Sequence, residues 1–172
     1  MELRRVRKHE ATRLRELRLR ALRDAPHAFA TSFERAQERP LRHWEDFAFK
    51  SEVAETQVTL VVVDDARWLA MTSCFLDEQE PHTAWLVQMW VDPGSRGVGL
   101  GRRLVEAAAD WARARGVTRL KTSVSEGNAA AEALYGAVGF HPTGERRRLA
   151  SNPSVAEVGL IRHLTADGQR CR

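Results

Sequence analysis

A glycine-rich segment from Arg96 to Gly101 has the features of a phosphate-binding loop. It carries glycine at every second position and lies directly before a stretch in which apolar residues recur at helical spacing. Glycine lets a ligand approach the backbone N–H groups closely. The first turn of a helix adds unpaired N–H donors and the positive end of the helix dipole, and both favour an anion. The segment therefore predicts a site for a phosphate or pyrophosphate.

The spacing of these glycines does not fit the two common nucleotide-binding loops. A P-loop needs a Lys followed by Ser or Thr after its last glycine, and a dinucleotide-binding turn needs the pattern G-x-G-x-x-G. Here the pattern is G-x-G-x-G, and arginines follow it. The segment instead resembles the R/Q-x-x-G-x-G/A signature of the GCN5-related N-acetyltransferase (GNAT) family, with Arg96, Gly99 and Gly101 at the fixed positions.

A second motif, at residues 128–140, resembles the same family. It matches the pattern N-x-x-A-x-x-L-Y-x-x-x-G-F at every defined position, from Asn128 through Tyr135 to Phe140. The two motifs stand in the order that the family requires, with a helix and a strand between them. The resemblance implies an α/β fold: a central, mostly antiparallel sheet flanked by helices, whose fourth and fifth strands splay apart to admit acyl-CoA.

The resemblance also implies a reaction and residues that serve it. The expected activity is N-acetyl transfer from acetyl-CoA to a primary amine of a small molecule or protein, by direct transfer in a ternary complex. Tyr135 is expected to protonate the departing CoA thiolate, and free backbone N–H groups of the fourth strand to meet the oxyanion. The implied cofactor contacts are Met89, Trp90, Val91, Arg96, Gly97, Val98, Gly99, Leu100, Gly101, Arg102 and Asn128.

The sequence leaves the proton acceptor for the attacking amine unassigned. An amine of this kind is neutral in only roughly one molecule in a thousand at pH 7, so its proton needs a route away. Several family members use a Glu five positions before the motif Asn, where this chain has Ser123. Glu34, Gln88, Asp92 and Glu126 are the nearby candidates by order along the chain. Gln88 cannot take a proton, whereas Glu34 falls in the region that shapes the acceptor pocket in this family.

Composition sets the remaining bounds. The chain has 172 residues and a formal net charge of +4, which suit one ordinary domain and a polyanionic cofactor. We expect no nucleic-acid partner, because no recognised binding pattern accompanies the basic residues.

Neither a membrane-spanning run nor a signal peptide is evident, and Cys74 and Cys171 do not indicate a disulfide framework, so a cytoplasmic protein is expected. The histidines lack metal-ligand spacing, which predicts no metal site. The sequence is compatible with a homodimer as well as with a monomer.

Apolar periodicity and turn residues predict strands and helices over most of the chain. Strands are expected near residues 3–6, 58–63, 68–76, 83–91, 120–124, 140–144 and 155–164. Helices are expected near 11–22, 32–47 with a break at Pro40, 100–115 and 128–138. The triplet Arg146–Arg148 is interpreted as a solvated turn, and residues 165–172 as a flexible tail. The segments 24–50 and 145–156 would shape the acceptor pocket, but they carry no motif that identifies the acceptor.

One further hypothesis belongs to a different class of protein. The same two motifs would also serve a non-catalytic acyl-CoA-binding regulatory domain. Tyr135 favours the enzyme, because a domain without turnover needs no phenol at the leaving group.

Overall fold

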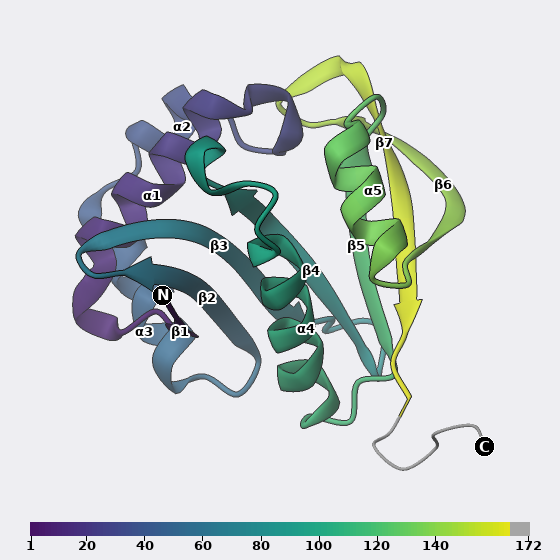
Figure 1. Ribbon diagram of the computed structural model, residues 1–172, viewed down its shortest axis with the longest axis horizontal. Coiled ribbons are helices and arrows are strands. Elements are labelled where there is room, and N and C mark those ends of the chain that lie inside the picture. The colour runs from purple at the N-terminus through teal and green to yellow at the C-terminus, as the bar shows by residue number, and fades with distance from the viewer. Residues whose placement is uncertain (166–172) are drawn as a thin grey trace.

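The computed structural model describes residues 1–165, which form one seven-stranded mixed sheet with helices on both faces (Figure 1). The strands are β1 (Glu2–Arg5), β2 (Gln57–Asp64), β3 (Arg67–Leu76), β4 (Thr83–Val91), β5 (Arg119–Ser125), β6 (His141–Leu149) and β7 (Asn152–His163). The helices are α1 (Ala11–Asp24), α2 (Phe33–Gln37), α3 (Leu41–Val53), α4 (Leu100–Arg113) and α5 (Ala129–Ala137), with short 3-10 turns η1 (Lys8–Glu10), η2 (Pro26–Ala28) and η3 (Pro93–Ser95). The mixed α/β fold class predicted from the sequence is confirmed.

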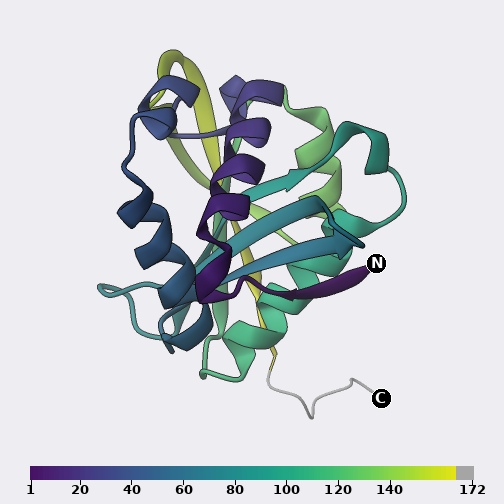
Figure 2. The ribbon, with the colours of Figure 1, turned by 90° about the vertical axis from the view of Figure 1, so that its left-hand side faces the viewer.

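Two hydrophobic cores lie on opposite faces of the sheet. In Figure 2, α1 and α3 stand in front of the sheet, and α4 and α5 lie behind it. Strand β2 supplies both cores, because successive side chains of a strand point to opposite faces. Leu60 and Val62 belong to the core under α4 and α5, whereas Val61 and Val63 belong to the core under α1, α2 and α3. This explains why the run from Leu60 to Val63 in β2 is apolar rather than alternating.

The strand order is β1-β2-β3-β4-β5-β7-β6, and β4–β5 is the parallel pair in an otherwise antiparallel arrangement. That pairing is short, running from Thr83 opposite Arg119 to Trp85 opposite Lys121. Each strand keeps a longer ladder on its other side, with β3 and with β7 respectively. The sheet is therefore open between the later halves of β4 and β5, as the predicted splay requires (Figure 1).

A bulge at Gln88 changes the direction of the side chains along β4. Ser73 pairs with Val87 and Met71 pairs with Trp90, so two steps along β3 correspond to three along β4. Gln88 has a φ of 58°, which is uncommon for a residue with a side chain. One extra residue moves the following side chains to the other face of the sheet. Leu86 accordingly packs on the α4 side before the bulge, whereas Trp90 packs on the α1 side after it.

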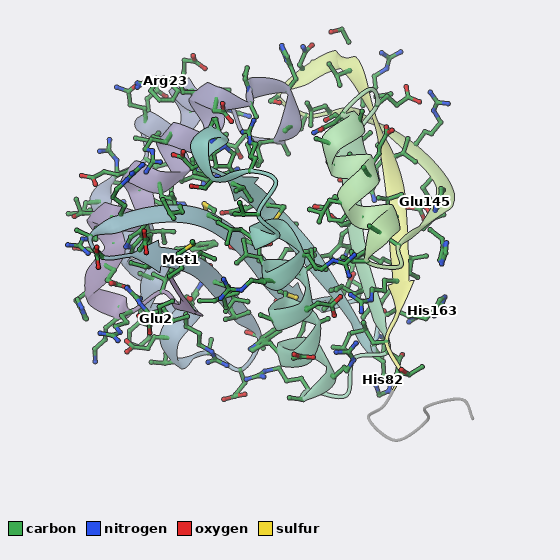
Figure 3. The ribbon with its side chains drawn as sticks, viewed as in Figure 1. Met1, Glu2, Arg23, His82, Glu145 and His163 are labelled. Atoms are coloured by element: carbon green, nitrogen blue, oxygen red, sulfur yellow. The ribbon has the colours of Figure 1, made fainter. Side chains whose placement is uncertain are left out.

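The last two strands differ from the prediction. The sequence placed a strand end at Gly144 and a solvated turn at Arg146–Arg148, but β6 continues to Leu149. Gly144, with a φ of 86°, instead lies in an irregularity of the β6–β7 ladder between Pro142 and Arg146. The arginines remain exposed because β6 is the edge strand, which Figure 3 marks at Glu145. Cys171 and all but the first residue of the expected tail lie outside the described residues.

Among residues 1–165, no helix is long and apolar enough to cross a membrane.

Candidate active site

The glycine-rich loop joins η3 to α4 with its backbone exposed. Gly97 has a φ of 80° and Gly99, the N-cap of α4, has a φ of 84°. These values favour glycine, and a Cβ added at either position would meet no protein atom within 4 Å. Gly101 fits closely for a different reason, since a Cβ there would stand 3.0 Å from a methyl group of Leu134 on α5 and this side chain would have to shift. The loop thus leaves open space at the N-terminus of α4, and α5 packs closely beside it.

Asn128 caps a second helix N-terminus, that of α5, beside the glycine-rich loop. Its side chain accepts a hydrogen bond from the backbone N–H of Ala131 at 3.2 Å, which confirms the predicted N-cap of α5. The two helix N-termini border a groove of about 490 Å³. The predicted cofactor contacts that line this groove are Met89, Trp90, Val91, Arg96, Gly97, Gly99, Leu100, Gly101, Arg102 and Asn128. Val98 is 64% exposed and is not among its lining residues.

Side chains of α1 hold the loop against the end of β4. The carboxylate of Asp24 accepts a hydrogen bond from the Trp90 indole N–H at 2.9 Å and forms an ion pair with Arg96. Arg96 also donates from Nε to the carbonyl oxygen of Val91 at 3.0 Å. Arg20 pairs with Asp92. Because the side chains of Trp90 and Arg96 are held by α1, their backbone groups are the parts offered to the groove.

Arg102 is engaged within the protein as well. Its guanidinium donates to the carbonyl oxygen of Ala137 at 3.1 Å, at the C-terminal end of α5. A cation there meets the negative end of the helix dipole. The contact between Arg102 and a phosphate, which the sequence predicted, would therefore have to use its backbone or displace this hydrogen bond.

A second cavity, of about 250 Å³, adjoins the groove and passes through the opening in the sheet. Both spaces are bordered by Ala28, Phe29, Met89, Asn128 and Ala131. The cavity is lined by side chains from both faces of β5, because Val124 packs in the α4-side core while the Ser125 hydroxyl donates to the His27 carbonyl in η2. A long ligand in the groove can therefore reach a second molecule that enters from the α1 side.

Tyr135 lies in the wall of this cavity on the α5 side. It is 4% exposed, and its ring meets Phe140 edge-on at a centroid distance of 5.3 Å. Burial raises the pKa of Tyr135, and a hydrogen bond with the side chain of Thr122 acts in the opposite direction. The phenol is therefore protonated at neutral pH and can donate a proton.

Glu157 is a cavity residue that sequence reasoning missed. The Ser123 hydroxyl donates to its carboxylate at 3.1 Å, and Glu157 pairs with Ser125 across the β5–β7 ladder. A carboxylate on β7 thus stands beside the position on β5 where the resemblance led us to expect a Glu. The hydrogen bond between Ser123 and Glu157 joins residues 34 positions apart, so no local sequence pattern predicts it.

The four residues that the sequence offered for the acceptor side lie in different settings in the structure. Gln88 lines the cavity, whereas Glu34 is exposed on α2 and lines neither the groove nor the cavity. Asp92 and Glu126 are paired with Arg20 and Arg146. The suggestion that Glu34 serves the acceptor therefore has no geometric support. No cluster of three or more metal-ligating side chains occurs within the described residues.

Comparison with known proteins identifies the family to which the chain belongs. The Acetyltransferase (GNAT) family profile matches residues 13–140, which include the glycine loop, the Asn128 motif and all five residues shared by the groove and the cavity. The chain belongs to the GNAT family. The resemblance inferred from the two motifs is thereby confirmed.

Individual relatives agree with this assignment. The ribosomal protein bS18-alanine N-acetyltransferase of Salmonella typhimurium is 34% identical over 123 residues, which cover 70% of this chain and 80% of that protein. The mycothiol acetyltransferase of Beutenbergia cavernae is 42% identical over 82 residues, which cover 48% of this chain but only 28% of that longer protein. Both are named acetyltransferases, and this GNAT chain is accordingly an acetyltransferase rather than a non-catalytic domain.

A solved structure extends the likeness over the whole fold. That of yncA from Salmonella typhimurium, determined with its cofactor acetyl-CoA, covers 99% of both chains with a TM-score of 0.76. The sequence identity is 18%, so this likeness establishes the shared fold alone.

The glycine loop generates a prediction on cofactor affinity. Gly99→Val should raise the Kd for acetyl-CoA at least about tenfold, because a branched side chain is strained at a positive φ and would fill the space beside the backbone donors. Arg103 is exposed in the first turn of α4, so Arg103→Ala should change the Kd less than about twofold, which corresponds to only about 0.4 kcal/mol. Calorimetric titration measures both. Gly116→Val is the matched control, since Gly116 has a φ of 73° but lies beyond the other end of α4. A folded Gly99→Val protein with the parent's affinity would refute the loop as the phosphate site.

The contacts of Asp24 generate a second prediction. Asp24→Ala removes the ion pair to Arg96 and the acceptor for the Trp90 indole, so the loop should lose its fixed position. We expect the Kd for acetyl-CoA to rise about tenfold, equivalent to about 1.4 kcal/mol. Glu16→Ala, an exposed position on the same helix, should bind like the parent. Equal affinities of the two variants would show that the loop needs no support from α1.

Proposed function

We propose that the protein transfers the acetyl group of acetyl-CoA to a primary amine by direct attack in a ternary complex. The observation that carries this proposal is the junction of two spaces, a groove at two helix N-termini and a cavity in the opening between β4 and β5. Ala131 borders both, and Tyr135 follows one helical turn later in the cavity wall. This arrangement supports a ligand that is held by its phosphates at one end and reacts at the other.

The cofactor would lie along the groove. Its pyrophosphate would meet the backbone N–H groups of the loop at the start of α4, where the helix dipole stabilises negative charge. The pantetheine arm would follow Met89, Trp90 and Val91, whose edge of β4 is not paired with β5. The unpaired peptide groups there can hydrogen-bond the amides of the arm and, near the bulge at Gln88, the acetyl oxygen.

The chemical step would then need two proton movements. The neutral amine attacks the thioester carbonyl carbon, and the resulting oxyanion is stabilised by a backbone N–H of β4. The C–S bond breaks, and Tyr135 gives its proton to the departing sulfur. The proton of the amine passes to Glu157, directly or through the Ser123 hydroxyl that already donates to it. The phenolate and the carboxylic acid then return to their starting states by exchange with water.

Tyr135→Phe tests the proposed general acid. General acid catalysis typically contributes a factor of about 10² to 10⁴, so kcat should fall on that scale while the Kd for acetyl-CoA stays constant. Because burial raises the pKa of Tyr135, the parent's alkaline limb from phenol ionisation should lie above the ordinary tyrosine value and should vanish in the variant. The loss should shrink with an acyl donor whose thiol has a lower pKa. Turnover within about twofold of the parent would reduce Tyr135 to a packing residue. Thiol release is the assay.

Glu157→Gln tests the proposed proton acceptor. The amide can still accept from Ser123 but cannot take a proton, so kcat/KM at pH 7 should fall by about 10². The defect should shrink as the pH rises, because solvent hydroxide, whose concentration grows about tenfold per pH unit, can then take the proton in place of the carboxylate. Glu34→Gln, the carboxylate suggested by chain order, should keep the parent's pH–rate profile. A profile of Glu157→Gln that coincides with the parent's would leave proton removal to solvent.

A further inference from the structure

Arg18 on α1 is a buried cation with no ion-pair partner among residues 1–165. It is 6% exposed, and its Nη1 atom has no hydrogen-bond partner among residues 1–165. It forms no salt bridge within the described part of the chain, and its guanidinium carbon lies over the ring of Phe29, 4.2 Å from the ring centroid. A ring face attracts a cation, but it does not neutralise the charge or accept its hydrogen bonds in full.

The charge persists at neutral pH despite this setting. Burial lowers the pKa of Arg18 to about 10, and the nearby charge of Arg39 acts in the same direction. An uncompensated buried charge is costly to a folded protein. Because this unpaired charge lines the cavity, it points to a ligand that supplies the missing anion.

A buried water does not remove this requirement. Arg18 also borders a pocket of about 30 Å³, whose lining includes Trp44, and the Trp44 indole N–H has no hydrogen-bond partner among residues 1–165. That volume holds a water molecule, which can accept hydrogen bonds from both residues. Water carries no net charge, however, and the other titratable residues bordering this pocket are Arg39 and His43, neither of which can supply an anion.

The opposite charge lies in the same cavity. Arg18 lines it from α1, at the left of Figure 1, and Glu157 lines it from β7, at the right. Glu157 shares the α1-side face of the sheet with Ser123 and Ser125. A small molecule between these two elements therefore meets a cation at one end and a carboxylate at the other.

We propose that the acceptor is an amino acid with a free carboxylate, whose carboxylate binds Arg18 and whose amino group lies at Glu157. A guanidinium binds a carboxylate through two parallel hydrogen bonds, which also fixes the orientation of the amine. This assignment rests on the proposed acetyl transfer and deepens it, because it names the substrate class of the same cavity.

The test compares amino acids with partners that lack the charge. Thiol release is followed with the standard amino acids, with their carboxamides and with the corresponding decarboxylated amines. The best amino acid should exceed its carboxamide in kcat/KM by at least about 100-fold, although the carboxamide's amine loses its proton more readily. Arg18→Met should bring the two within about threefold of each other, and Arg13→Met, an exposed position on α1, should keep the preference. Efficient turnover of the carboxamides or amines by the parent would overturn this inference while upholding acetyl transfer.

A binding measurement keeps the inference testable without turnover. With CoA bound, the N-acetyl derivative of an amino acid should raise the Tm of the parent, and its carboxamide should not. Arg18→Met should abolish that shift. The ligand-free variant should also unfold at a higher temperature than the parent, because an apolar side chain of similar length replaces an unpaired buried charge. A lower Tm of the ligand-free variant, or no shift with any of the acetylated amino acids, would make Arg18 a structural residue and refute the assignment.

Discussion

The interruption of hydrogen bonding between β4 and β5 is the constraint on which the rest of the structure depends. The two strands pair only from Thr83 to Trp85, and beyond that point each is held by its other neighbour. Unpaired peptide groups inside a protein are costly unless a ligand or water satisfies them. The opening therefore both creates the cavity and leaves β4 with donors and acceptors for a cofactor. The ladders with β3 and β7 keep the two strands in place while this gap stays open.

The bulge at Gln88 makes the two sides of that opening different. It turns Trp90 toward α1, where Asp24 holds the indole, and leaves Met89 and Val91 packed on the α4 side. The same Asp24 also holds Arg96, so one carboxylate connects the end of β4 to the glycine loop. Contacts of α1 thus hold both the end of β4 and the glycine loop. Tyr135 and Glu157 line the cavity from opposite faces of the sheet.

The sequence predicted those parts of the site that depend on local conformation. Gly99 must adopt a positive φ at a helix start, Asn128 caps the next helix, and Tyr135 follows from helical spacing; each is readable within a few residues. Glu157 and Arg18 could not be predicted in this way, because they reach the cavity only through the β5–β7 ladder and the packing of α1. The bulge at Gln88 was equally hidden, since neither glycine nor proline marks it. The extent of β6 was misjudged because Gly144 resembles a strand end but lies within an irregular ladder.

The central claim is that the reactive end of the cofactor lies in the opening between β4 and β5, next to the phenol of Tyr135. The most direct test is the structure of the complex with CoA. The account predicts the pyrophosphate at Gly97–Gly101, the pantetheine arm along Met89–Val91, and the thiol sulfur within hydrogen-bond reach of the Tyr135 oxygen. A complex in which the phosphates occupy the loop but the sulfur lies outside the opening, away from Tyr135, would contradict it.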